Sequence, residues 1–208
     1  MVVSEPVPGS RLRGTTLELI MKMKVFSALA LLTSYQVFAD SCWKSAEQET
    51  GIDRYLLAAV SQVESGHRPQ ALAVANKGVW LSKQPASISQ ALSWAEWLNQ
   101  RGYTFAIGST QINWRAHGKR LEAQGVTMKK LYCDPCLQIH NGAKILRDCF
   151  DRVGFNWNGV GCYYTGPGKN RLPWERYKYA KKVYANYAWY KKMQPKLVVP
   201  EINDSVCS

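Results

Sequence analysis

Glu64 is the residue with the clearest potential for general acid chemistry. It lies near the end of RYLLAAVSQVES, residues 54–65, whose apolar positions recur at helical spacing. Glu64 follows Val60 by four residues and Leu57 by seven, so it shares the apolar face of that helix. Burial there would raise the pKa of the carboxyl, and a carboxyl protonated near neutral pH can donate a proton to a glycosidic oxygen. The ordinary alternative is a solvated or capping glutamate near a helix end.

The segment that follows Glu64 lacks a second carboxylate. No Asp or Glu occurs at residues 65–95 or 97–121. Most glycosidases use a pair of carboxylates, so a single acid acting on a sugar needs another nucleophile. Folding could still bring a second carboxylate across the cleft from Asp134, Asp148 or Asp151. We expect Asp134 to cap a helix and the other two to lie on the polar side of theirs.

Three motifs follow ESGHRPQA, residues 64–71, in a fixed order. They are AIGSTQIN at 106–113, CYYTGPGKNRLPW at 162–174 and YAKKVYANY at 179–187. Together the four motifs resemble those of lytic transglycosylases, the lysozyme-like enzymes that cut peptidoglycan. The segments QPASISQALSWAEWLNQRGYTF and DPCLQIHNGAKIL are similar to the periplasmic transglycosylases of type IV secretion, conjugation and pilus systems.

The resemblance implies a role for each matched residue. Glu64 would be the single catalytic acid and base. Ser65 would orient Glu64 or touch the amide groups of the substrate, and Gln111 would hydrogen-bond the substrate in the cleft. Tyr163 would line the site near Glu64 and steer its proton. Tyr179 would hold the last helix against the catalytic helix, with plain core packing as the alternative.

Two of the motifs depart from the family pattern. Ser109 and Thr110 stand where the family has Leu-Met, which changes one apolar wall of the sugar cleft. Cys162 and Tyr164 replace an Ala and an Asn of the third motif. Because of the first change, a protein that binds the cell wall but cuts it weakly is still an alternative.

The resemblance implies a reaction that consumes no water. The muramyl residue would supply its own nucleophile, first its N-acetyl group and then its 6-hydroxyl, and leave a 1,6-anhydromuramyl end. The alternatives are a muramidase that hydrolyses with water and a catalytically weak peptidoglycan-binding assembly module. The expected partners are peptidoglycan glycan strands and components of a secretion, conjugation or pilus apparatus. We expect a monomer with no cofactor and no metal.

Helical patterns dominate the chain after residue 40. Predicted helices cover 54–65 after a cap at Asp53, 87–102, 135–153 after a cap at Asp134, and 173–192. Residues 103–110 are expected to be irregular or briefly extended, and the tail after Pro195 to be extended. The predicted class is mainly α, a lysozyme-like α+β fold with little or no sheet.

The N-terminus has the pattern of an export signal. Lys22 and Lys24 precede an apolar stretch that ends at Ala39, which fits a signal-peptidase site. We therefore predict an extension and signal peptide at 1–39, a lysozyme-like domain with a basic C-terminal helix and tail at 40–208, and a periplasmic location. The formal net charge of +12 favours an anionic partner. Export and the lack of any groove-reading or RNA-binding motif argue against nucleic acid.

All six cysteines follow residue 40, and an even number in an exported chain indicates disulfides. CDPC at 133–136 could instead be a redox pair, or a zinc half-site with His140. No flanking β-α-β pattern and no second ligand pair support those alternatives. The sequence leaves the pairing open. The pairing that we favour is Cys42–Cys136, Cys149–Cys162 and Cys133–Cys207.

Overall fold

The computed structural model describes residues 41–208 except residue 77 and residues 169–171, and Ala39–Ser208 forms one compact unit. The predicted extension and signal peptide at 1–39 lie outside the described residues. Within the described ranges, no helix is both long and apolar enough to cross a membrane.

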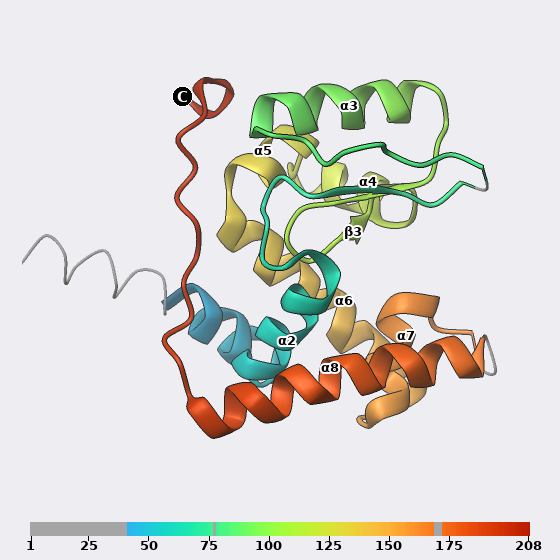
Figure 1. The fold of residues 1–208 in the computed structure, drawn as a ribbon, viewed down its shortest axis with the longest axis vertical. Coiled ribbons are helices and arrows are strands. Elements are labelled where there is room, and N and C mark those ends of the chain that lie inside the picture. Colours follow the sequence, from blue (N-terminus) through green and yellow to red (C-terminus); the bar gives the residue numbers. More distant parts are fainter. Residues whose placement is uncertain (1–40, 77, 169–171) are drawn as a thin grey trace, which may run out of the picture. The chain divides into compact units, whose positions relative to one another are not determined.

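Helices make up most of the described unit, as the sequence predicts (Figure 1). The first covers residues 41–50. It is followed by α2 (Arg54–Ser65), α3 (Ile88–Gln100), α4 (Trp114–Ala123), α5 (Met128–Cys133), α6 (Pro135–Val153), α7 (Trp157–Thr165), α8 (Pro173–Met193) and the short 3-10 helix η1 (Ser205–Cys207).

Side-chain caps start these helices where the sequence places them. Asp53 accepts a hydrogen bond from the Tyr55 amide at the start of α2, and Asp134 accepts one from the Leu137 amide at the start of α6. Each cap satisfies an amide that has no partner within its helix. The predicted caps at Asp53 and Asp134 are confirmed.

Helix α7 is an element that the sequence analysis did not assign. Its sequence, WNGVGCYYT, holds two glycines and lacks a clear apolar stripe. Asn156 caps its first turn, and its glycines let it lie against its neighbours. A Cβ on Gly161 would come within 2.7 Å of the Cβ of Arg176 in α8. Close packing stabilises this helix, and helical propensity predicts it poorly.

A small antiparallel sheet completes the fold. Its strands are β1 (Leu72–Val74), β2 (Phe105–Ile107) and β3 (Ile112–Asn113), in the order β1-β2-β3. Leu72 pairs with Ile107, which pairs in turn with Ile112. The prediction of a mainly α protein with little sheet is confirmed.

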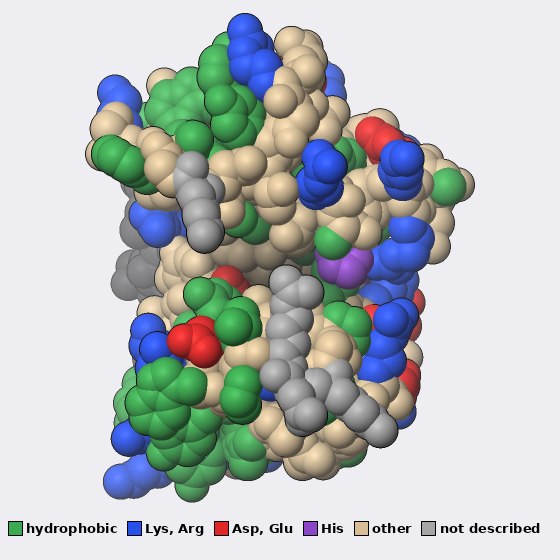
Figure 2. Space-filling model, turned by 90° about the vertical axis from the view of Figure 1, so that its right-hand side faces the viewer, with side chains coloured by type: hydrophobic (Ala, Val, Ile, Leu, Met, Phe, Trp, Pro, Cys, Tyr) green, Lys and Arg blue, Asp and Glu red, His purple; other side chains and the backbone are tan. Residues whose placement is uncertain are grey.

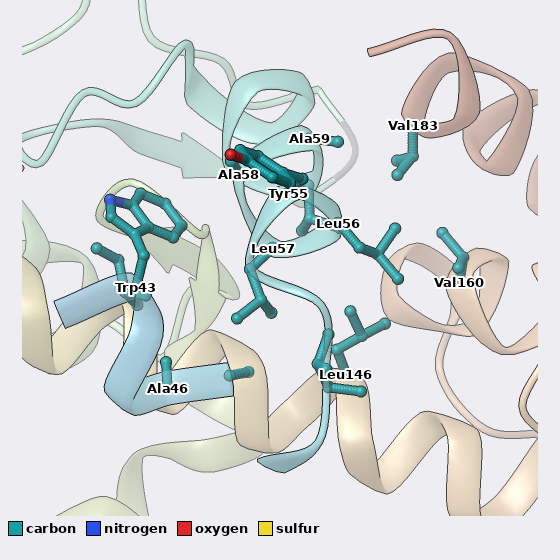
Figure 3. Close-up of a cluster of buried hydrophobic side chains, with 14 of the residues drawn as sticks. Trp43, Ala46, Tyr55, Leu56, Leu57, Ala58, Ala59, Leu146, Val160 and Val183 are labelled. Atoms are coloured by element: carbon teal, nitrogen blue, oxygen red, sulfur yellow. The ribbon is translucent and has the colours of Figure 1, made fainter. Parts of the chain in front are cut away.

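Two hydrophobic cores flank the region that holds Glu64. One joins the helix at 41–50 with α2, α6, α7 and α8, and in it the side chains of Leu56, Val160 and Val183 converge (Figure 3). The other joins α3, the sheet and α5 around Phe105, Ile107 and other buried side chains. Ser65 at the end of α2 donates a hydrogen bond to the backbone oxygen of Ser109, in the turn between β2 and β3, so the end of α2 lies where the two cores meet.

Three disulfides join elements that are distant in sequence, with the pairing favoured above. Cys42–Cys136 ties the first helix to the start of α6, and Cys149–Cys162 ties α6 to α7. Cys133–Cys207 ties α5 to η1 and so fixes the tail. The predicted pairing is confirmed.

The bridge between Cys133 and Cys207 is expected to stabilise the fold, because it links residues 74 apart in sequence and so restricts the unfolded chain. The double variant Cys133→Ser/Cys207→Ser should lower the free energy of unfolding by about 3 kcal/mol. Urea denaturation of the oxidised proteins measures the difference. Denatured, non-reduced parent protein should show no free thiols, and two or more per chain would contradict the assigned bridges.

Candidate active site

Glu64 lies one residue before the C-terminal residue of α2. The chain then turns at Gly66, whose φ of 64° is left-handed and suits glycine. The half-buried Glu64 side chain faces a cavity of about 630 Å³ between the ends of α2 and α7 and one face of α8. The residues that line the cavity are Val63, Glu64, Tyr164, Glu175, Lys178, Tyr179, Lys181, Lys182 and Ala185.

The environment of Glu64 raises its pKa to about 7. Desolvation by the surrounding protein is the main cause, and a hydrogen bond from Tyr179 partly opposes it. A substantial fraction of the Glu64 carboxyl is therefore protonated at neutral pH. It can give up a proton under conditions in which an exposed glutamate is already ionised.

Tyr179 of α8 donates a hydrogen bond to Oε1 of Glu64 at 2.6 Å. Its pKa lies well above its ordinary value, because its hydroxyl is buried and faces the Glu64 carboxylate. The tyrosine therefore stays a neutral donor. Its ring stacks on Tyr164, with the ring centroids 5.3 Å apart. Both tyrosines line the Glu64 cavity, so together they form an aromatic wall beside the carboxyl.

Tyr163 of α7 has a buried hydroxyl that donates to the backbone oxygen of Thr110 at 2.7 Å. Burial raises the pKa of this tyrosine above its ordinary value, and the negative charge of Glu64 adds to the effect. Tyr163 thus joins α7 to the β2–β3 turn and lies near Glu64. Its expected role in steering the proton of Glu64 remains a prediction.

Ser65 turns inward and not toward the cavity. Its buried hydroxyl donates to the backbone oxygen of Ser109 at 2.7 Å and accepts a hydrogen bond from the Arg68 amide. These bonds join the end of α2 to the β2–β3 turn. A part for Ser65 in orienting Glu64 or in binding substrate amides stays a prediction.

Gln111 lies at the end of the β2–β3 turn with a left-handed φ of 50°. Its half-buried side chain donates to the backbone oxygen of Gly108 at 2.9 Å. Substrate binding by Gln111 remains a prediction. The structure therefore gathers Glu64, Tyr163 and Tyr179, and it places Ser65 and Gln111 at the turn beside them.

Gln138 of α6 supports this turn and was not singled out from the sequence. Its fully buried amide accepts a hydrogen bond from the Ser109 amide and donates to the backbone oxygens of Pro69 and Leu131. One side chain thus connects three separate segments under the site. A glutamine in a helix gives no local signal of such a position.

Arg176 of α8 is a second supporting residue that the sequence analysis missed. The side chain is only 4% exposed, and its guanidinium donates to Thr165 Oγ1, the Gly166 oxygen and the Gly168 oxygen at 2.6–2.8 Å. It holds the turn that follows α7 against α8. Nothing in the sequence distinguishes it from the solvated lysines of the same helix.

The position of other carboxylates bears on the reaction. Asp134 caps α6, while Asp148 and Asp151 form ion pairs with arginines on the surface of that helix. Glu175 was not among the carboxylates that the sequence analysis considered as a second acid. It nevertheless lines the Glu64 cavity, where its carboxylate lies 3.5 Å from Lys178. Among the described residues that line the cavity, the two carboxylates are Glu64 and Glu175.

The possible zinc half-site around CDPC does not offer free thiolates. The ligand atoms of Cys42, Cys136 and His140 lie within 4.8 Å of one another, but the two cysteines form a disulfide with each other. His140 is bound instead by Ser45 and Glu49. The group thus has the chemistry of a structural bridge with a hydrogen-bonded histidine beside it.

Comparison with known proteins decides the family. The model of the family described as Transglycosylase SLT domain matches residues 41–186. The chain belongs to this transglycosylase family. The match includes Glu64 and all the residues assigned to the site above, and it covers most of both cores of the described unit.

Relatives of this transglycosylase chain occur in several bacteria. It is 33% identical over 163 residues to the invasion protein IagB of Salmonella typhi, covering 78% of this chain and 84% of the relative. It is 31% identical over 144 residues to the type IV secretion system protein virB1 of Brucella abortus, covering 65% and 55%. It is 32% identical over 146 residues to protein IpgF of Shigella flexneri, covering 70% and 78%.

Proposed function

We propose that the protein is a lytic transglycosylase that cleaves the MurNAc–GlcNAc β-1,4 bond of peptidoglycan and leaves 1,6-anhydromuramyl ends. The observation that carries the proposal is the Glu64 carboxyl, with its pKa near 7, hydrogen-bonded by Tyr179 and facing the cavity. This is the protonation behaviour that a single group needs to act first as an acid and then as a base.

The first step is proton transfer from Glu64 to the glycosidic oxygen, which breaks the bond to C1 of the muramyl residue. Positive charge then develops at C1. The other carboxylate of the described cavity lining, Glu175, is paired with Lys178. We infer that the acetamido oxygen of the substrate instead bonds to C1 and takes up the positive charge. The muramyl 6-hydroxyl then attacks C1 and displaces the acetamido oxygen, and Glu64, now ionised, accepts the hydroxyl proton.

The names of the relatives support a place for this reaction in the cell envelope. The Brucella relative is a type IV secretion system protein, and the Salmonella relative is an invasion protein. We infer that this protein opens the wall locally for a secretion, conjugation or pilus system. That role requires the periplasmic location that the predicted signal peptide at 21–39 would provide.

Mass spectrometry of digested peptidoglycan tests the chemistry. An anhydro product weighs one water less than the hydrolysed product, so muropeptides short by one water should dominate and new reducing muramyl ends should be absent. Glu175→Gln should give the same anhydro products as the parent. Reducing ends in the parent digest, lost in Glu175→Gln, would instead identify a muramidase with two carboxylates.

The pKa of Glu64 sets an expected pH dependence. The acid step needs a protonated carboxyl, so kcat/KM should fall above pH 7, by about tenfold for each further pH unit. Tyr179→Phe removes the hydrogen bond that favours the carboxylate, so it should raise the pKa and move this limb to higher pH. Rates on peptidoglycan between pH 5 and 9 measure the shift. If kcat/KM of Tyr179→Phe fell at the same pH as in the parent, or at a lower pH, the result would contradict a hydrogen bond that favours the ionised carboxylate.

A further inference from the structure

The outward face of α8 carries mainly aromatic and lysine side chains. The helix buries Arg176, Tyr179 and Val183 against the rest of the unit. On its other side, exposed residues follow one another by three or four positions, so they form one continuous stripe along the helix. The residues of this surface, called the α8 stripe, are Trp174, Tyr177, Lys181, Tyr184, Ala188 and Lys192.

Large aromatic rings are exposed along the N-terminal half of the α8 stripe. Trp174, Tyr177 and Tyr184 each expose more than half of their surface. Trp157 of α7 packs edge-on against Tyr184, with the ring centroids 5.1 Å apart, and an open pocket of about 430 Å³ lies beside these rings. Figure 2 shows hydrophobic side chains gathered at the lower left, over α8, with Lys and Arg side chains beside them. A contiguous exposed apolar patch of this kind marks an interaction surface.

The charge of the α8 stripe is positive. Glu175 is the single acidic residue in the sequence of α8, and it lies outside the stripe, where it lines the Glu64 cavity and pairs with Lys178. Lys181 lies in the middle of the stripe and Lys192 at its end. Within the part of the chain that the structure describes, neither of these two lysines has an ion-pair partner. The stripe therefore presents uncompensated cations among its rings.

We propose that the α8 stripe, together with Trp157, binds the surface of a membrane that contains anionic phospholipids. Trp and Tyr rings occupy the boundary between lipid headgroups and acyl chains, because an apolar ring with one polar edge suits that layer. Lysine stems lie along apolar surface while their ammonium groups reach the phosphates. Rings and lysines on one exposed helix face are the pattern of a helix that lies in the membrane interface.

The position of Lys181 favours a lipid surface over a protein partner. Lys181 lies between Tyr177 and Tyr184 and lines the pocket beside them. The centre of a protein–protein interface is poor in lysine, because a buried ammonium loses its water. A second copy of this chain would also bring like charges together across a two-fold axis. Headgroups stay hydrated, so an ammonium group among them keeps both water and phosphate as partners.

Binding of the whole chain to lipid vesicles, with bound and free protein separated by sedimentation, tests the proposal. The parent should bind vesicles of phosphatidylglycerol and phosphatidylethanolamine more tightly than vesicles of phosphatidylcholine alone. Trp174→Ser/Tyr177→Ser should weaken binding to the anionic vesicles at least tenfold, because burial of roughly 60 Å² of ring surface already accounts for that factor. Lys192→Gln should weaken it about fivefold, the contribution of one lysine near an anionic surface.

Trp80→Ser is the matched control, because Trp80 is exposed beside α3 and lies outside the α8 stripe, so this variant should bind like the parent. Every variant has the same residues 1–40, so a difference in binding between variants reports on α8. Glu64→Gln should also bind like the parent, which makes the result independent of turnover and of the proposed function.

Two results of the vesicle experiment would overturn the proposal. One is a parent without preference for the anionic vesicles, and the other is equal binding by the parent and Trp174→Ser/Tyr177→Ser. Sedimentation without lipid examines the other occupant. A parent that forms a dimer, is made monomeric by Trp174→Ser/Tyr177→Ser and leaves the vesicles unbound would overturn the proposal in favour of a second copy of the chain.

Discussion

Glu64→Gln is expected to lower the rate of peptidoglycan cleavage by about 10³-fold, within the range for loss of a general acid and base. Glutamine has nearly the same size, and it can still accept the hydrogen bond from Tyr179. It has no proton to give to the leaving oxygen and cannot take one from the 6-hydroxyl. Release of soluble muropeptides from purified peptidoglycan measures the rate. A variant that clears peptidoglycan nearly as fast as the parent would refute the assignment of Glu64.

The pH dependence of the free energy of unfolding provides the control for Glu64→Gln. The folded pKa of about 7 lies above the ordinary value of 4.5, so the unfolded chain loses this proton first as pH rises. The parent should therefore lose stability between about pH 4.5 and pH 7 through this group, and the glutamine variant should not. The variant should equal the parent at pH 4 and exceed it above pH 7. Parallel stability curves would contradict the raised pKa.

Arg176→Met is expected to give the second large effect, on stability. It removes the donor of three hydrogen bonds and leaves Thr165 Oγ1 and the oxygens of Gly166 and Gly168 without that donor. Unfolding should become easier by about 3 kcal/mol, because hydrogen bonds from a charged group are among the stronger ones. In a chain of this size that corresponds to a fall in Tm of roughly 10 °C.

Thermal unfolding followed by circular dichroism measures the effect of Arg176→Met. The matched control is Lys192→Met on the same helix, where the side chain is exposed and Tm should change little. Activity below the unfolding transition should also fall, since the turn that Arg176 holds lies next to Tyr164, which lines the Glu64 cavity. Equal Tm values for Arg176→Met and its control would contradict a supporting role.

Local patterns in the sequence were sufficient to predict much of this fold. Asp53 and Asp134 identified the starts of α2 and α6, because a cap acts on amides two or three residues away. Helical spacing put Glu64 on the buried face of α2, where its pKa is raised. The motif order indicated the family, and the even number of cysteines indicated bridges. Each signal lies in a short stretch, in the order of such stretches along the chain or in composition, so it can be read without the tertiary arrangement.

Contacts between distant segments were decided only by the tertiary structure. Tyr179 was expected to join two helices, but its hydrogen bond to Glu64 spans 115 residues of sequence and depends on how α8 packs on α2. Glu175 enters the cavity, and Arg176 beside it turns into the interior, because successive residues of a helix face different directions. Helix α7 depends on close packing at Gly161. Sequence periodicity could indicate that a face is buried, whereas its partner was set by the packing of elements distant in the chain.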